Sequence, residues 1–208
     1  MPNNSTHMND QILLEFVASS RKYCALIEQT GMYTLKEFIN QIHLLLPELY
    51  LKGAHLPVFE SPIESQNQRY VTEEAYDYIY NKLLVKLGEY DAYEEVFDPN
   101  RIESENAIGA SISEDLADIY QDIKDFILLY EMGPGEIIDE AFWEVRQSFE
   151  LYWGQKLVNT LRAIHNLRFS EEEIEESEFK PQENANFKRV GNVNWIISKR
   201  QEEYRDDK

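Results

Sequence analysis

Four aspartates recur at helical spacing within residues 113–130: Asp115, Asp118, Asp122 and Asp125. Residues three and four apart lie on one side of an α-helix, so these carboxylates should form a row along one helix. Such a row could bind a hard divalent cation, because carboxylate oxygens are its preferred ligands. No Glu-x-x-His or His-x-His pattern is present to complete a metal site, and a solvated or ion-paired face is the favoured interpretation.

Two charged residues interrupt the apolar face of the segment 137–165. Arg146 and Glu150 fall within this face when it is plotted at 3.6 residues per turn, and their i, i+4 spacing allows them to pair. A buried charge without a partner costs on the order of several kcal/mol. We therefore expect both residues to have partners, and Asp118 or Asp122 on the neighbouring helix are the candidates.

Together with a histidine at the end of this segment, these residues define one candidate polar cluster: Asp118, Asp122, Arg146, Glu150 and His165. The cluster could line a pocket in the core that binds a small molecule or a metal. The alternative, which we favour, is a sealed network of structural ion pairs. Asp125 is expected on the solvated side of its helix, and His165 is typical of a residue that interacts with a helix C-terminus.

The sequence does not identify a catalytic residue, a cofactor or a bound metal. Gly-x-Ser-x-Gly, P-loop, Gly-x-Gly-x-x-Gly and Cys-x-x-Cys patterns are all missing. The one cysteine, Cys24, lies on the apolar face of its helix, where a buried thiol is usually inert. His43 falls off the apolar face of its helix and is expected to be exposed.

Helical periodicity dominates the chain and predicts an all-α fold. Apolar faces favour helices around residues 13–30, 35–49, 73–87, 113–130 and 137–165, with a further short helix at 90–97. Thr34, Thr72 and either Ser111 or Ser113 are the expected N-caps, and Pro47 should bend or stop the second helix. No segment before Val190 alternates like a strand. We expect a single bundle of five to six helices over residues 9–168.

The remaining segment, residues 169–208, is expected to be an acidic, loosely ordered tail. Residues 171–178 contain six glutamates, whereas residues 184–200 contain four basic residues around Trp195 and no acidic residue. This reversal of charge indicates a tail that either packs on the acidic domain or binds a partner.

The overall charge excludes several classes of partner. The 20 basic and 39 acidic residues give a formal charge of −19, which repels nucleic acids and anionic membranes. One cysteine cannot form an intrachain disulfide, and neither a secretory signal nor a membrane span is expected, so a reducing cytoplasm fits best.

Several motifs resemble a bacterial family of domains of unknown function. They are Tyr90-Asp-Ala-Tyr-Glu-Glu-Val-Phe-Asp-Pro99, the run from Glu114 to Asp125, Trp143-Glu-Val-Arg-Gln-Ser-Phe-Glu-Leu-Tyr-Trp-Gly154 and Leu161-Arg-Ala-Ile-His165. The resemblance covers roughly residues 10–168. It implies an all-helical cytoplasmic protein with no assigned activity, and it carries over no catalytic residue.

Two hypotheses about function follow. The favoured one is a non-enzymatic cytoplasmic accessory protein that binds another protein. The alternative is a small-molecule- or metal-binding enzyme that uses the candidate polar cluster as a pocket. The two differ in whether the polar side chains line an accessible site or are sealed by pairing with one another.

Overall fold

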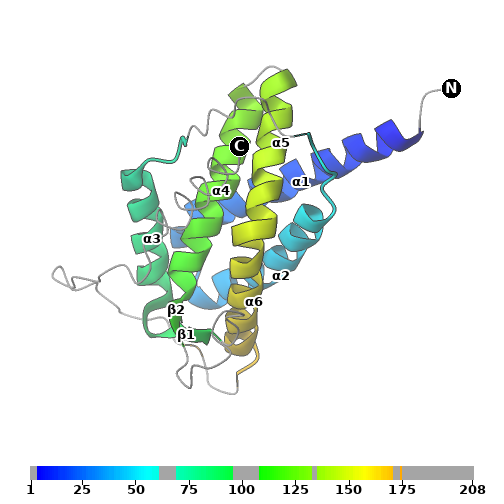
Figure 1. The fold of residues 1–208 in the computed structure, drawn as a ribbon. Coiled ribbons are helices and arrows are strands. Elements are labelled where there is room, and N and C mark those ends of the chain that lie inside the picture. The colour runs from blue at the N-terminus through cyan, green and yellow to red at the C-terminus, as the bar shows by residue number, and fades with distance from the viewer. Residues whose placement is uncertain (1–3, 61–68, 96–107, 133–134, 171–173, 175–208) are drawn as a thin grey trace.

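The computed structural model describes residues 4–60, 69–95, 108–132, 135–170 and 174 of the chain (Figure 1). Its helices are α1 (Asn4–Glu28), α2 (Leu35–Ala54), α3 (Glu73–Leu87), α4 (Ile112–Met132), α5 (Gly135–Ser148) and α6 (Gly154–Arg168). Two short 3-10 turns, η1 (Thr30–Met32) and η2 (Gly88–Tyr90), follow α1 and α3. The all-α class is confirmed. Within these ranges, no helix is long and apolar enough to span a membrane.

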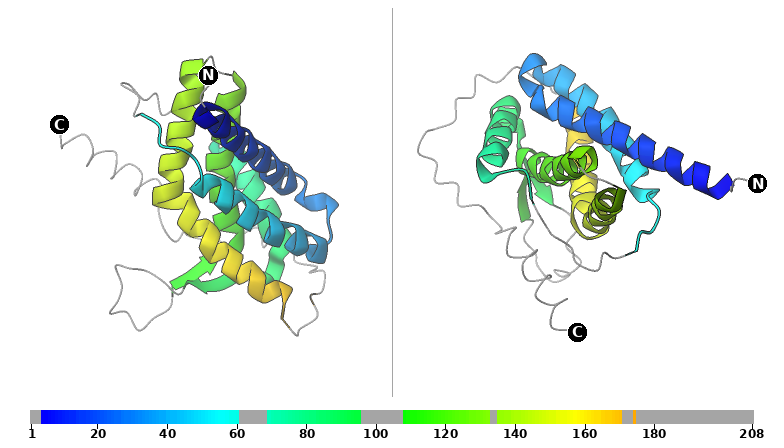
Figure 2. Two further views of the ribbon diagram at one scale, coloured as in Figure 1. Left: turned by 90° about the vertical axis from the view of Figure 1, so that its right-hand side faces the viewer. Right: turned by 90° about the horizontal axis from the view of Figure 1, so that it is seen from above.

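The central element of the bundle is α4. It packs against α1, α3, α5 and α6, and its buried residues include the polar Ser113, Asp115 and Asp118. In Figure 2 (left), α1, α2 and α6 lie side by side as one layer, with α2 between the other two. The core therefore lies between this layer and α3, and α4 passes through it.

The start of α4 is fixed by contacts with the segment that follows α3. The Ser111 hydroxyl accepts from the Glu114 backbone N–H at 3.1 Å, so Ser111 is the N-cap. Asp91 accepts from the Ser111 hydroxyl and from the Ser113 N–H, each at 2.7 Å. These bonds connect residues about twenty positions apart and hold the two segments together.

The expected short helix at 90–97 is wrong. Strand β1 (Ala92–Glu95) instead pairs antiparallel with β2 (Ile108–Ser111), with Ala92 opposite Ser111. The bonds from Asp91 to the start of α4 stabilise this extended pairing, and tertiary contacts of that kind override local helix propensity. In the part of the chain that the structure describes, these two strands form the whole sheet.

The other expected helix ends are mostly confirmed. Thr34 forms a capping box with Glu37, and Thr72 caps α3 by accepting from the Ala75 N–H at 3.2 Å. Pro47 does not stop α2, which continues to Ala54. Because Pro47 is exposed, its ring points away from the core.

The expected helix 137–165 is divided by a π-helical turn, η3 (Phe149–Trp153), between α5 and α6. Trp153 is fully buried there and donates to the Val145 carbonyl at 3.1 Å. Gly53 of α2 provides the space, because a Cβ at that position would lie 2.8 Å from the Trp153 ring. A π-turn widens the helix and changes the direction of the side chains that follow it.

The expected tail begins at residue 169, and most of it lies outside the described residues, including the charge reversal and Trp195. Of its described residues, Phe169 is exposed and Ile174 is partly buried against the core.

Two neighbouring serines of α1 provide a test of the packing between α1 and α2. Both are buried; the Ser19 hydroxyl donates to Glu48 at 2.8 Å, whereas the Ser20 hydroxyl finds no partner among the described residues. We expect Ser20→Ala to raise the free energy of unfolding by about 1 kcal/mol, because it removes an unsatisfied buried group. Ser19→Ala should lower it by about 1 kcal/mol. Urea melts of the two variants measure this, and equal effects would contradict the assigned contacts.

Candidate functional site

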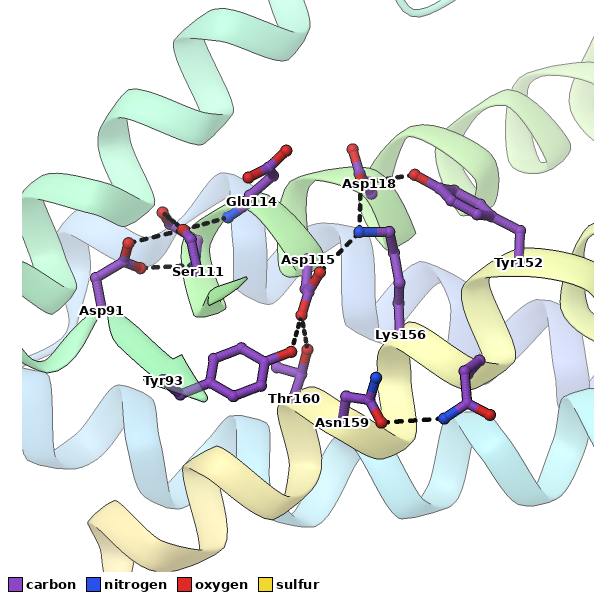
Figure 3. Close-up of polar contacts among 12 residues, drawn as sticks. Asp91, Tyr93, Ser111, Glu114, Asp115, Asp118, Tyr152, Lys156, Asn159 and Thr160 are labelled. Carbon is purple, nitrogen blue, oxygen red and sulfur yellow. Dashed lines mark hydrogen bonds and ion pairs between the residues drawn. The ribbon is translucent and has the colours of Figure 1, made fainter. Parts of the chain in front are cut away.

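Two carboxylates of α4 form the centre of a buried polar cluster. The side chains of Asp115 and Asp118 are 8% and 4% exposed. The Lys156 ammonium of α6 lies 2.8 Å from Asp115 Oδ1 and 3.0 Å from Asp118 Oδ2, so that one cation bridges both acids (Figure 3). A buried carboxylate requires such a partner, because its own desolvation is costly.

Hydroxyl groups occupy the remaining positions on these carboxylates. Asp118 accepts from the Tyr76 hydroxyl at 2.7 Å and from the Tyr152 hydroxyl at 2.6 Å. Asp115 Oδ2 accepts from the Tyr93 hydroxyl and from Thr160 Oγ1. We call the set Asp115, Asp118, Lys156, Tyr76, Tyr93, Tyr152 and Thr160 the Asp–Lys–Tyr cluster.

The cluster joins five elements through residues at regular helical spacing. Asp115 and Asp118 are three apart on α4, while Tyr152, Lys156 and Thr160 follow one another at intervals of four along η3 and α6. Each set therefore lies along one side of its helix. Tyr76 reaches the cluster from α3, and Tyr93 reaches it from β1.

The electrostatics of the cluster keep Lys156 and Tyr152 protonated. Burial alone would lower the pKa of Lys156, but the charges of Asp115 and Asp118 outweigh burial and raise this pKa above its ordinary value. Burial, together with the charge of Asp118 and the bond to it, raises the pKa of Tyr152 far above its ordinary value. A lysine held as ammonium and a phenol held neutral are poor nucleophiles and poor bases at neutral pH. The arrangement is suited to stability rather than to acid–base chemistry.

A metal ion is also a poor fit to this cluster. The position between the two carboxylates, where a cation would bind, is filled by the Lys156 ammonium. Across the described ranges, no group of three or more His, Cys, Asp or Glu side chains is arranged to hold a metal.

The expected cluster of Asp118, Asp122, Arg146, Glu150 and His165 is not brought together as one set of contacts. Arg146 and Glu150 pair at 2.6 Å, as their spacing predicts. Arg146 also donates to the Leu56 carbonyl, beyond the end of α2, and Glu150 is about half exposed. The expectation that Arg146 neutralises Asp118 or Asp122 is wrong: Lys156, which the sequence analysis missed, does so for Asp118.

His165 lies at the other end of α6, against α2. Its Nδ1 is 3.2 Å from His43 Nε2, and the Arg168 guanidinium is 2.6 Å from His43 Nδ1. Arginine can only donate, so His43 accepts at Nδ1 and donates from Nε2 to His165. Burial and the charges of Arg168 and His165 lower the pKa of His43. His43 is thus half-buried in a contact between helices, contrary to the expected exposed position.

Asp125 is not on a solvated surface, as the sequence analysis expected. Its carboxylate accepts from the backbone N–H groups of Tyr70 and Val71 at 2.9 and 2.7 Å. Burial raises the pKa of Asp125 despite these bonds. The residue therefore fixes the segment that leads into α3.

Asp122 is the least well compensated carboxylate of the row. Its side chain is 10% exposed, it accepts from the Ser148 hydroxyl, and its nearest cation, Arg69, is 3.8 Å away. Burial raises its pKa to about 6, despite the opposing effects of the Ser148 bond and the Arg69 charge.

Replacement of Lys156 tests the Asp–Lys–Tyr cluster. Lys156→Met leaves Asp115 and Asp118 without a cation, and we expect the free energy of unfolding at pH 7 to fall by about 3 kcal/mol. The matched control is Lys22→Met, which removes an exposed pair with Glu48 and should change stability by less than about 0.5 kcal/mol. A similar decrease in the free energy of unfolding for both variants would show that Lys156 does not stabilise the Asp–Lys–Tyr cluster.

The raised pKa of Asp122 predicts that its contribution to stability depends on pH. Between about pH 4 and 6 the folded state binds more protons at Asp122 than the unfolded chain, so this group makes stability fall as pH rises through that window. Asp122→Asn should therefore stabilise the protein at pH 7, by up to about 3 kcal/mol, and have little effect at pH 4. Urea melts at both pH values measure the difference. A variant less stable than wild type at pH 7 would contradict the assigned charge penalty.

Comparisons with known proteins agree with this fold. A family model described as a domain of unknown function (DUF5063) matches residues 7–170. The crystal structure of protein BF1032 from Bacteroides fragilis is similar, with 37% sequence identity and a TM-score of 0.70; the match covers 80% of this chain and 98% of that one. A comparison with curated proteins finds no match. The chain belongs to the DUF5063 family, for which the family description gives no function.

Proposed function

We propose that this protein is a non-enzymatic, cytoplasmic accessory protein that acts by binding another protein through the outer surface of its bundle. The observation that carries the proposal is the saturation of the Asp–Lys–Tyr cluster. All four carboxylate oxygens of Asp115 and Asp118 accept hydrogen bonds or ion pairs from side chains of the same chain. Polar groups that satisfy one another have little left to offer a substrate.

The alternative is an enzyme that binds a small molecule or a metal in the bundle core. It would require a group that changes protonation near neutral pH and can reach a substrate. Asp122 comes nearest, because its pKa is about 6. However, Asp122 is almost fully buried, and its known contacts are with Ser148 and Arg69. We therefore place this alternative second.

The proposed location rests on cysteine usage. Cys24 is buried in the core, and burial raises the pKa of its thiol to about 12. A thiol of this kind is inert, and a chain with one cysteine cannot form an intrachain disulfide. Both features fit a reducing compartment.

Co-purification from the native host tests the proposal. The tagged full-length chain is cross-linked in cells and purified, and the recovered proteins are quantified by mass spectrometry. Tyr152→Phe is the matched variant, because it removes one hydroxyl from the Asp–Lys–Tyr cluster and leaves the outer surface unchanged. We expect the same partner to be recovered with the wild type and the variant.

The host phenotype separates the two functions. If deletion of the gene causes a phenotype, Tyr152→Phe should rescue it as well as the wild type at matched protein levels. Failure of a stable Tyr152→Phe protein to rescue, with no specific partner recovered, would favour the enzyme and reject the proposal.

A further inference from the structure

Exposed apolar side chains follow the outer sides of α2 and α6. Leu44 and Leu51 are seven residues apart on α2 and are 65% and 51% exposed. Val158 of α6 is 43% exposed, and Phe169, at the end of that helix, is 61% exposed. Side chains of this size are usually buried against something when several occur together on one surface.

Contacts at both ends show that the two helices run side by side in opposite directions, as Figure 2 (left) shows. His43 of α2 meets His165 of α6 at 3.2 Å. Tyr50, seven residues further along α2, meets Phe149 with ring centroids 5.2 Å apart. Val158 is seven residues before His165, so it lies on the side of α6 that faces α2. We call this surface the α2–α6 face.

The charge of this surface differs from that of the whole chain. The chain carries a formal charge of −19, yet α6 contains no acidic residue. Lys156 points inward to Asp115 and Asp118, but Arg162 is exposed and Arg168 lies at the end of α6 against His43. Lys36 of α2 is also exposed, seven residues before His43. The acidic residues of α2 are Glu37, in the capping box, and Glu48, which pairs with Ser19 and Lys22 of α1. Three basic side chains, Lys36, Arg162 and Arg168, therefore border the apolar part of the α2–α6 face beside the single exposed acid Glu37.

We infer that the α2–α6 face binds an acidic amphipathic segment of a partner protein. The inference rests on the proposed function and names the surface and the chemistry of the partner. Apolar side chains of the segment would be buried against Leu44, Leu51, Val158 and Phe169. Its carboxylates would pair with Arg162 and Arg168, and a bidentate arginine–carboxylate pair sets the orientation of the segment.

Charge complementarity decides between the possible occupants. A second copy of the chain would bring another −19 and the same basic border to the surface, so two like surfaces would repel. A nucleic acid is repelled by the field of the chain as a whole and has no apolar side chains to bury on this surface. An acidic segment meets the same overall field, but it gains from the local basic groups, and its apolar side chains contribute the larger part of the affinity.

Selection from a displayed library of random peptides tests the inference. Peptides of about 16 residues can cover about 24 Å as a helix, enough to span the α2–α6 face. The full-length chain is immobilised, and the best peptides are measured by fluorescence anisotropy. We expect the selected peptides to be enriched in Asp and Glu, with large apolar residues at intervals of three and four. Their binding should weaken as salt is raised.

The binding variant is Leu44→Glu with Arg162→Glu, which places two carboxylates on the surface. We expect it to bind the selected peptides at least about tenfold more weakly, because it loses an apolar contact and a charge pair. Leu14→Glu is the matched control, since Leu14 is 60% exposed on α1, and it should bind as the wild type does. Thermal melts of the three proteins should be alike.

Several results would overturn the inference. The selection could yield no enriched peptide, or it could yield peptides that are not enriched in Asp and Glu. The Leu44→Glu, Arg162→Glu variant could also bind the selected peptides as tightly as the wild type does. Self-association of the wild type that this variant abolishes would assign the surface to a second copy. If the selected peptides bind the full chain only after Glu171, Glu172 and Glu173 are all replaced by Gln, the occupant of the surface is the chain's own acidic segment, which would overturn the inference. A native partner that still co-purifies with the Leu44→Glu, Arg162→Glu variant would leave the proposed function standing and reject only this surface.

Discussion

The bridge from Lys156 to Asp115 and Asp118 is the interaction on which the rest of the bundle depends. The central helix α4 is buried on several sides, yet it carries two carboxylates within the core. Burial of both charges would be prohibitive without a cation and a full set of donors. The requirement fixes the positions of α3, β1, η3 and α6 around α4, because each element supplies a donor to the same two side chains. The polar cluster thus specifies how the helices are arranged, while apolar burial supplies most of the stability.

Local signals predicted the helices well. The caps Thr34, Thr72 and Ser111 depend on neighbours three residues away, and all three are confirmed. The row of aspartates on α4 could be predicted from the sequence for the same reason. The partner of each aspartate could not be predicted, because those partners come from distant segments. Asp125 was expected to face solvent, but it accepts from Tyr70 and Val71, more than fifty residues earlier in the chain. The strand at Ala92–Glu95 was missed for the same reason, since its partner is β2.

The error about Arg146 concerns its partners. A wheel at 3.6 residues per turn shows which residues of the segment 137–165 face inward, and Leu157 and Ile164, beyond the π-turn η3, are buried as the wheel assigns. The wheel does not show which helix each inward residue meets. Arg146 lies before the turn and reaches the Leu56 carbonyl, whereas Lys156 lies after it and reaches α4. The spacing of Tyr152, Lys156 and Thr160 could have revealed the correct face, because it places three donors on one side of an acid-free helix.

Helix α6 contributes side chains both to the polar cluster in the interior of the bundle and to its surface. Its inward face supplies Lys156 and Thr160 to the carboxylates of α4, while Val158 and Arg162 of the same helix are exposed. An acidic residue on the inward face would add a third negative charge to a cluster that has one cation. An acidic residue on the outward face would leave folding intact, because exposed charges contribute little to stability. Folding alone therefore explains why α6 lacks acids on one side only. The basic, apolar character of its other side calls for a separate reason, and the proposed recognition of an acidic partner would supply one.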